Sequence, residues 1–218
     1  MFNDQPTVSR RRFVSSSLVS AALLVVACRA PATVSQTSPT GASTSSALAA
    51  TVLTPTAANV DPEDATPAET EGPYFKPNSP ERTSLVGAGV VGTKLALTGQ
   101  VVSQHGQPIA KALLDFWQAD GQGNYDNAAY TLRGHQFTDA EGRYQLATVV
   151  PGLYPGRTRH IHVKVQAPNQ AILTTQLYFP NEPRNTSDSL FNARLLMTLQ
   201  DAADGSKLGQ FKFVLNVG

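Results

Sequence analysis

The stretch that decides the fold is "HIHVKVQA", His160 to Ala167, in which polar and aliphatic side chains alternate. Successive side chains of a β-strand point to opposite faces of its sheet, so this alternation predicts a strand. The aliphatic face would enter a hydrophobic core through Ile161, Val163 and Val165. On the opposite face, His160 and His162 would lie about 6.5 to 7 Å apart along the chain.

Six further segments of the same kind flank this strand. Each is short, rich in β-branched and aromatic residues, and bounded by Gly, Pro, Asn or Asp, which is typical of strands separated by turns. They are Lys94–Ser103, Ala112–Ala119, Gln136–Asp139, Arg143–Val149, Leu173–Phe179 and Gly209–Val217. Regularly spaced strands predict an all-β fold, an antiparallel β-sandwich with long loops and little helix. A short helix is expected near Ser187 to Leu196.

The N-terminal part has a different composition. Arginines at 10–12 precede an apolar run of about ten residues, half the roughly 20 that a membrane-spanning helix needs, which is the layout of a signal peptide. Ser9 to Val14 resembles the twin-arginine export signal. Leu24 to Cys28 resembles a lipobox, whose cysteine becomes lipidated; the alternative is a chance cysteine behind an ordinary signal sequence. We expect residues 1–28 to direct export and Cys28 to anchor a bacterial lipoprotein to a membrane outside the cytoplasm.

The rest of the chain divides into a tether and one domain. Residues 29–65 consist largely of Ala, Ser, Thr and Pro, which cannot bury enough surface to fold and therefore predict a disordered tether. Residues 66–218 are enough for one domain with a single core. The net charge of +1 gives no strong field that would attract nucleic acid. Cys28 is the only cysteine, so no intramolecular disulfide is expected.

The histidine pair raises the question of a metal site. Two imidazoles on one strand face can bind one ion, although the bare His-x-His pattern also fits two exposed histidines on a solvated face. No usable cysteine and no obvious carboxylate pair lie near, so tyrosine is the remaining candidate ligand. Tyr154 lies in "PGLYPG" and Tyr125 in "ADGQGNYDN". A phenol binds a metal only when the ion is acidic enough to remove its proton, which favours a hard trivalent cation such as Fe(III).

Five segments together resemble the intradiol ring-cleavage dioxygenases, the family of catechol 1,2-dioxygenase and protocatechuate 3,4-dioxygenase. They are "TEGPYF" (70–75), "LTGQVVSQHGQPIAKALLDFWQADGQGNY" (97–125), "TDAEGRY" (138–144), "PGLYPGRTRHIH" (151–162) and "TQLYF" (175–179). The resemblance covers essentially the whole folded part, and the order and local spacing of the motifs agree.

The resemblance implies a prealbumin-like sandwich that holds one non-haem Fe(III) ion. The implied metal ligands are Tyr125, Tyr154, His160 and His162. Arg157 matches an arginine that supports the electron-rich substrate ring, Gln176 matches a pocket glutamine, and Tyr154 would also accept a substrate proton. The implied partners are a small aromatic diol and O2, and the product is a cis,cis-muconate-type diacid. The resemblance gives no role to nucleic acid.

Some neighbouring positions depart from the family or have an expected structural role. Only "PGRTR" separates Tyr154 from His160, where the best-known members carry a longer loop, so we expect a more open pocket. Gly156 stands where protocatechuate enzymes present a bulky aromatic residue. Trp117 is expected to pack against the base of the site rather than touch substrate, and Arg159 is expected to be solvated.

A second class of function fits part of the same sequence. Segments such as "GQVVSQHGQPIAKALL" and "TDAEGRYQLATVVPGLY" also suit a non-enzymatic, surface-tethered β-sandwich module that binds carbohydrate or protein, because these turns serve the sandwich itself. Such a module has no reason to assemble Tyr125, Arg157, His160 and His162. Convergence of these side chains therefore separates the two hypotheses.

Overall fold

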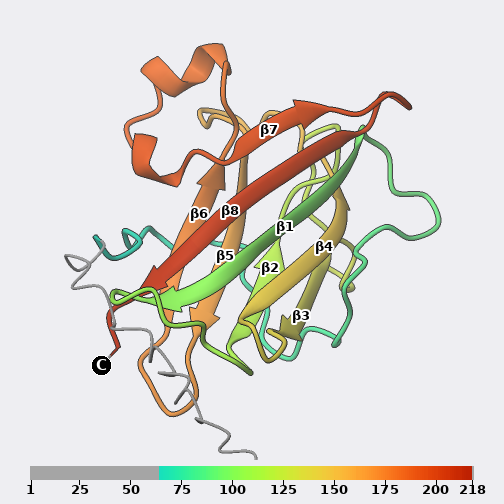
Figure 1. Cartoon of the computed structure of the whole chain (residues 1–218). Coiled ribbons are helices and arrows are strands. Elements are labelled where there is room, and N and C mark those ends of the chain that lie inside the picture. The colour runs from blue at the N-terminus through green and yellow to red at the C-terminus, as the bar shows by residue number, and fades with distance from the viewer. Residues whose placement is uncertain (1–63, 218) are drawn as a thin grey trace, which may run out of the picture. The chain divides into compact units, whose positions relative to one another are not determined.

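The domain is a sandwich of two four-stranded β-sheets, seen in a computed structural model that describes residues 64–217 (Figure 1). The first sheet has the order β4-β1-β8-β7, with β1 Lys94–Ser103, β4 Arg143–Val149, β7 Thr198–Asp201 and β8 Lys207–Leu215. The second has the order β3-β2-β5-β6, with β2 Leu113–Trp117, β3 Arg133–Phe137, β5 His160–Gln166 and β6 Leu173–Tyr178. The predicted all-β sandwich is confirmed.

The predicted signal peptide, the lipobox cysteine and nearly all of the predicted tether lie outside the described residues. Within residues 64–217 no helix is long and apolar enough to cross a membrane.

Six of the predicted strands lie within two residues of the observed bounds, but β3 begins at Arg133, three residues before the predicted Gln136, and ends at Phe137, two residues before the predicted Asp139. There are three further differences. β7 was not predicted, because its four residues are mostly exposed and show no alternation. The helix predicted near Ser187 to Leu196 is wrong: two 3₁₀ turns, η1 Pro183–Thr186 and η2 Ala193–Leu195, flank an irregular segment instead. Side chains at both ends of that segment bond to backbone N–H groups two residues on, which competes with a regular helix. The third difference is that β1 pairs with β8 in parallel, while every other neighbouring pair is antiparallel.

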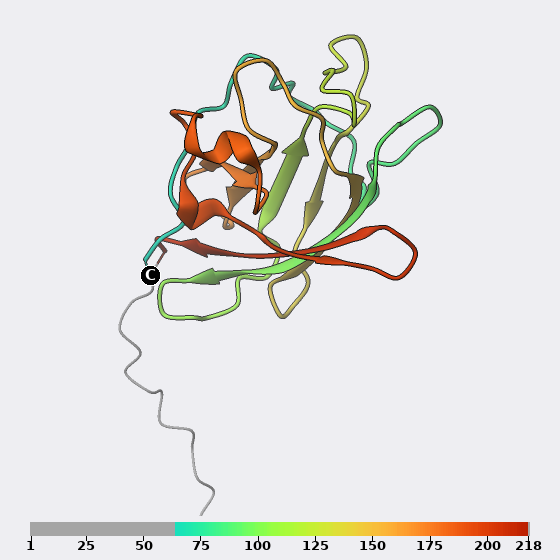
Figure 2. The same cartoon turned by 90° about the horizontal axis from the view of Figure 1, so that it is seen from above.

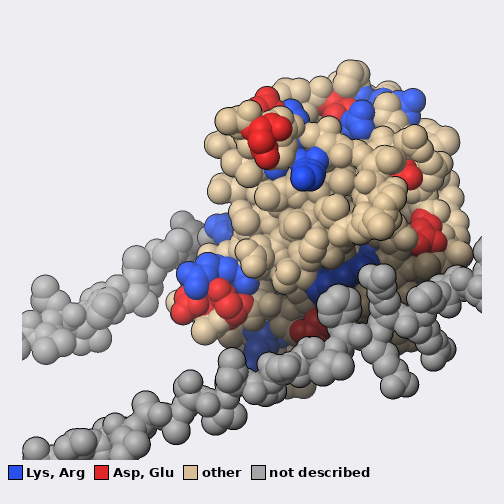
Figure 3. All heavy atoms as spheres, turned by 90° about the vertical axis from the view of Figure 1, so that its right-hand side faces the viewer, with Lys and Arg blue, Asp and Glu red and all other residues tan. Residues whose placement is uncertain are grey.

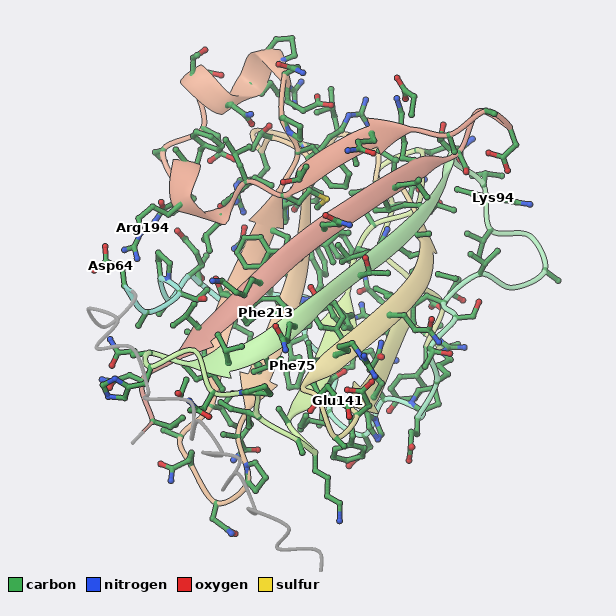
Figure 4. The ribbon with its side chains drawn as sticks, viewed as in Figure 1. Asp64, Phe75, Lys94, Glu141, Arg194 and Phe213 are labelled. Carbon is green, nitrogen blue, oxygen red and sulfur yellow. The ribbon has the colours of Figure 1, made fainter. Side chains whose placement is uncertain are left out.

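The core lies between the two sheets. The aliphatic face of β5 is fully buried there, with Ile161, Val163 and Val165 each 0% exposed, as the alternation predicted. Leu97 of β1 and Phe213 of β8 enter the same cluster from the first sheet. Phe213 is labelled in Figure 4. Burying one side chain of this size contributes about 1.5 to 3 kcal/mol, so the two facing rows hold the sheets together.

The outer face of the second sheet is covered by the N-terminal strap, residues 64–85, which runs along it as the teal segment in Figure 2. The strap begins beside η2, where the Arg194 Nη2 lies 3.7 Å from the Asp64 Oδ2 (Figure 4). The Glu69 backbone N–H donates to the Thr174 carbonyl over 2.9 Å, and Lys164 forms an ion pair of 2.5 Å with Glu71. The strap therefore seals polar side chains of the sheet from water.

Candidate metal centre

The candidate site is built on one row of residues that crosses the second sheet. Trp117 of β2 pairs with Arg133 of β3 and with His162 of β5, and His162 pairs with Gln176 of β6. Paired residues point to the same face, and here it is the outer face beneath the strap. All four side chains are buried, with exposed fractions of 0% to 3%. The alternative of two exposed histidines on a solvated face is excluded, since His160 is 5% and His162 is 3% exposed.

Both histidines point into one buried cluster. The Nε2 atoms of His160 and His162 lie 3.1 Å apart, and the Tyr125 hydroxyl lies 3.4 Å from the His160 Nε2. The His160 Nδ1 lies 2.7 Å from the Thr158 carbonyl oxygen. Because that oxygen can only accept, Nδ1 carries the proton and Nε2 presents a lone pair, as in histidines that bind metals.

The donor set fits one metal ion. Two nitrogens bound at right angles to an ion about 2.1 Å away lie about 3 Å apart, which is close to the separation of these imidazoles. Within residues 64–217 no three His, Cys, Asp or Glu side chains gather into such a group. A metal at His160 and His162 would therefore need phenol oxygens as its other protein ligands.

Tyr154 lies beside Tyr125 but has a different hydrogen-bond partner. Its hydroxyl lies 2.9 Å from the hydroxyl of Tyr74, and its ring meets the Tyr125 ring edge-on at 5.9 Å. Tyr74 in turn stacks on Tyr125 with ring centroids 4.3 Å apart. Three phenols therefore meet here, one more than the sequence predicted. Tyr74 lies in the quoted motif "TEGPYF". The strap around it shows no alternation of polar and apolar residues, so the sequence did not indicate that its side chain points into the site.

Burial sets the protonation of the cluster. Desolvation raises the pKa of Tyr125 well above its usual range, although the nearby charges of Arg157 and Arg133 oppose this. Desolvation also lowers the pKa of His160 to about 4 and that of His162 well below its usual value. The imidazoles are thus neutral, the form that binds a metal, and a cation is what would allow Tyr125 to lose its proton.

The two other predicted residues also meet. Arg157 donates from Nη2 to the Gln176 Oε1 over 2.7 Å and to the Tyr178 hydroxyl over 3.2 Å. The Gln176 Nε2 donates to the Thr70 carbonyl of the strap over 2.9 Å. Through its Nε, Arg157 also forms an ion pair of 2.9 Å with Asp188. Asp188 was not predicted, because a helix was expected there and its pattern gave no reason for the carboxylate to point inward.

Two secondary expectations have different outcomes. Trp117 does pack against the base of the site, since its ring stacks on His162 with centroids 4.9 Å apart and an interplanar angle of 8°. The prediction that Arg159 is solvated is wrong. Its side chain is 28% exposed and forms an ion pair of 2.8 Å with Glu182. That carboxylate follows β6 by only four residues, so the ion pair joins two loops at the same end of the sheet.

A wide groove of about 840 Å³ lies elsewhere, on the outer face of the first sheet. It is lined by Gln100, Arg143 and Gln210 among others and contains none of the predicted site residues. Charged side chains on the side of the molecule drawn in Figure 3 form small groups of both signs. At the turn before β4, Arg143 forms ion pairs with Asp139 and Glu141.

Comparison with known proteins defines the family. A family model described as "Dioxygenase" matches residues 70–217. The dioxygenase domain of a dioxygenase and carbohydrate-binding protein fusion from Streptomyces sp. SirexAA-E is 56% identical, with a TM-score of 0.69 over 71% of this chain and 100% of that one. 3-Chlorocatechol 1,2-dioxygenase from Rhodococcus opacus 1CP is 32% identical, with a TM-score of 0.66 over 72% and 74% of the two chains. The chain belongs to the intradiol ring-cleavage dioxygenase family.

A curated relative agrees with this assignment. The protocatechuate 3,4-dioxygenase beta chain of Burkholderia cepacia is 31% identical over 153 residues, which are 57% of this chain and 65% of that one. The chain thus spans less than two thirds of the length of that relative.

Proposed function

We propose that this domain is a non-haem Fe(III)-dependent dioxygenase that cleaves a catechol-type aromatic between its two hydroxylated carbons. Both atoms of O2 would enter the product, a cis,cis-muconate-type diacid. The observation that carries the proposal is that the His160 Nε2 lies 3.4 Å from the Tyr125 hydroxyl and 3.1 Å from the His162 Nε2, in a chain of this family. Tyr125, Tyr154, His160 and His162 would hold the ion, which when bound makes the aromatic ring reactive toward O2.

The residues of the chain have separate tasks in this proposal. Tyr154 accepts a proton from the incoming diol. The Tyr74 hydroxyl lies 2.9 Å from the Tyr154 hydroxyl, so Tyr74 is placed to keep a hydrogen bond to Tyr154 during this step. Arg157 brings positive charge to the electron-rich ring. Gln176 holds Arg157 through Oε1 and the strap through Nε2, so it joins the arginine to the segment that covers the site. The strap and Trp117 exclude water from one side.

The competing hypothesis, a non-enzymatic binding module, does not require these side chains to lie together. Their convergence beneath the strap counts against it. The wide groove on the other sheet has no part in the proposed chemistry.

Iron content, the visible spectrum and product analysis together test the proposal. The purified protein should contain about one iron per chain and be coloured by phenolate-to-iron charge transfer, and the band should shift when catechol is added. With catechol, hydroxyquinol and protocatechuate in turn, at least one should consume O2 and yield the ring-opened diacid. Iron-free protein that folds normally and opens none of these rings would overturn the proposal.

We also propose that the protein acts outside the cytoplasm, as an exported lipoprotein anchored through Cys28. The support comes from the sequence of residues 1–28 alone, with its arginine cluster, short apolar run and lipobox-like end.

A further inference from the structure

Asp188 is a buried carboxylate that no part of the proposed chemistry uses directly. It lies between η1 and η2, and its side chain is 2% exposed. Its Oδ2 accepts from the Nε of Arg157 over 2.9 Å and from the backbone N–H of Thr158 over 2.8 Å. Its Oδ1 accepts from the Leu190 N–H over 3.0 Å. One carboxylate therefore binds both the guanidinium and the backbone next to it.

A second nitrogen of the Arg157 guanidinium, Nη2, is also held. Nη2 donates to Gln176 and to Tyr178, and the Tyr178 hydroxyl donates to the Leu190 carbonyl over 2.8 Å. Within residues 64–217, Nη1 makes no hydrogen bond. A guanidinium fixed at two of its three nitrogens in this way holds the third, Nη1, in one orientation.

The positive charge of Arg157 influences the pKa values of Tyr125, His160 and His162. Its positive charge opposes protonation of the imidazoles of His160 and His162 and stabilises the anionic form of Tyr125. Its side chain is only 17% exposed, so it is largely shielded from water. The Asp188 carboxylate lies on the side where Nε is bound and balances part of this charge.

We propose that Asp188 is the positioning residue of the reaction: it holds the Arg157 guanidinium so that Nη1 faces the aromatic substrate. This inference rests on the proposed function. Arginine is long and loses much side-chain freedom when fixed, so a partner that fixes it beforehand removes that cost from substrate binding.

The loop that carries Arg157 has other attachments. The Thr158 hydroxyl donates to the Asn185 side chain over 2.6 Å, and the Asn185 amide donates to the Phe179 carbonyl over 2.9 Å. Arg184 donates to the Tyr154 carbonyl over 3.2 Å. Loss of the Asp188 charge should therefore free the Nε end of the guanidinium, which Nη2 alone would then hold, while the loop stays in place.

A double-mutant cycle of Asp188→Asn and Arg157→Gln in the iron-loaded protein tests this. Two quantities are measured: kcat/KM for catechol, and the Kd of 4-nitrocatechol from an absorbance titration without O2. D188N should weaken both by about 10- to 100-fold in the wild-type background, the range for loss of a group that orients another. In the R157Q background it should change either by less than about twofold.

Asp139→Asn is the matched control. Asp139 accepts from the Nε of Arg143 and from two backbone N–H groups, as Asp188 does, but the pair is exposed and lies away from the site. D139N should leave both quantities unchanged within about twofold. If D188N does not fold, Asp188→Glu replaces it, and its smaller loss should again vanish in the R157Q background.

Three results would overturn the inference. D188N could leave the wild type unaffected, or it could be equally harmful with and without Arg157, which would show a structural role only. A wild-type protein that binds neither iron nor 4-nitrocatechol would instead overturn the proposed function, and the inference would fall with it.

Discussion

At the scale of single residues, the oxygen of Tyr125 is the atom that separates a metal centre from a packed aromatic cluster. Tyr125→Phe keeps the ring that stacks on Tyr74 and removes the phenol oxygen that lies 3.4 Å from the His160 Nε2. We expect iron content to fall at least tenfold, about the minimum for loss of a group that supports the metal, and the charge-transfer band to weaken with it. Elemental analysis and the visible spectrum measure this.

Tyr130→Phe is the control for that variant. The Tyr130 hydroxyl donates to the Pro77 carbonyl over 2.9 Å and is exposed, so its loss should leave the iron content unchanged. Full iron occupancy in Y125F would contradict the assignment of Tyr125 as a ligand.

The buried histidines predict how stability depends on pH in the metal-free protein. The pKa of His160 is lowered to about 4 in the folded state, against about 6.5 when unfolded, so below pH 6.5 the unfolded state binds the proton first. The contribution of these neutral histidines to the free energy of unfolding is fully present above pH 6.5. It falls as pH drops toward 4, by about 1.4 kcal/mol per pH unit for each histidine. Asp115 and Glu69, whose pKa values burial raises, partly oppose this.

Urea unfolding between pH 7 and 4.5 measures that slope. The variant His160→Gln, His162→Gln lacks both imidazoles and should show a clearly flatter profile than the wild type. Equal slopes in the two proteins would mean that the histidines do not control stability in this range.

The sequence predicted which residues belong to the site better than it predicted which other residues they contact. The alternation in β5 placed His160 and His162 on one face, and resemblance to the family added both tyrosines, Arg157 and Gln176. Tyr74 and Asp188 come from the strap and from an irregular segment, where no periodicity tells which way a side chain points. Arg159 was misplaced for the same reason, because its partner Glu182 follows a different strand.

At the scale of elements, Gly99 in β1 is the point where the first sheet tolerates no side chain. A Cβ there would lie 1.8 Å from the Phe211 carbonyl oxygen of β8 and 2.7 Å from the Tyr144 hydroxyl of β4. We expect Gly99→Ala to destabilise the domain by about 3 kcal/mol, the upper end of the usual cost of overpacking. Chemical denaturation measures this.

Gly87→Ala is the matched change in an exposed loop. A Cβ at Gly87 would meet nothing within 4 Å, so the variant should stay within about 0.5 kcal/mol of the wild type. Wild-type stability in G99A would mean that β1 and β8 do not pair as closely as the structure has them.

The elements themselves were predictable where burial alternates along a strand. The bounds of β1 and β4 agree with the sequence pattern to the residue: buried and exposed side chains alternate over most of β4 and over the first five residues of β1. β7 lies at a sheet edge with little burial, and its pairing with β8 depends on a partner that the sequence cannot indicate. The parallel pairing of β1 with β8 is likewise a property of the whole fold, since most of the domain lies between them in sequence.

At the scale of the whole molecule, the site exists only once the sandwich is complete. Tyr125, Tyr154 and the histidines of β5 come from three segments that meet only when β2 and β5 are paired and the strap is in place. An unfolded chain therefore has no preformed centre, and iron would bind the folded domain. The proposed twin-arginine route suits this order of events, because it carries proteins that are already folded.

Replacing the twin arginines tests whether folding and metal binding precede export. Arg10→Lys with Arg11→Lys should leave folded, iron-bound protein in the cytoplasm, because the receptor would no longer read the signal while the domain is untouched. Arg12→Lys alters the neighbouring position of "SRRRFV" and should be exported as the wild type is. Cell fractionation with iron analysis of each fraction measures both. Undiminished export of the double variant would place the export signal elsewhere in the chain, and iron-free protein in the cytoplasm would show that loading follows export.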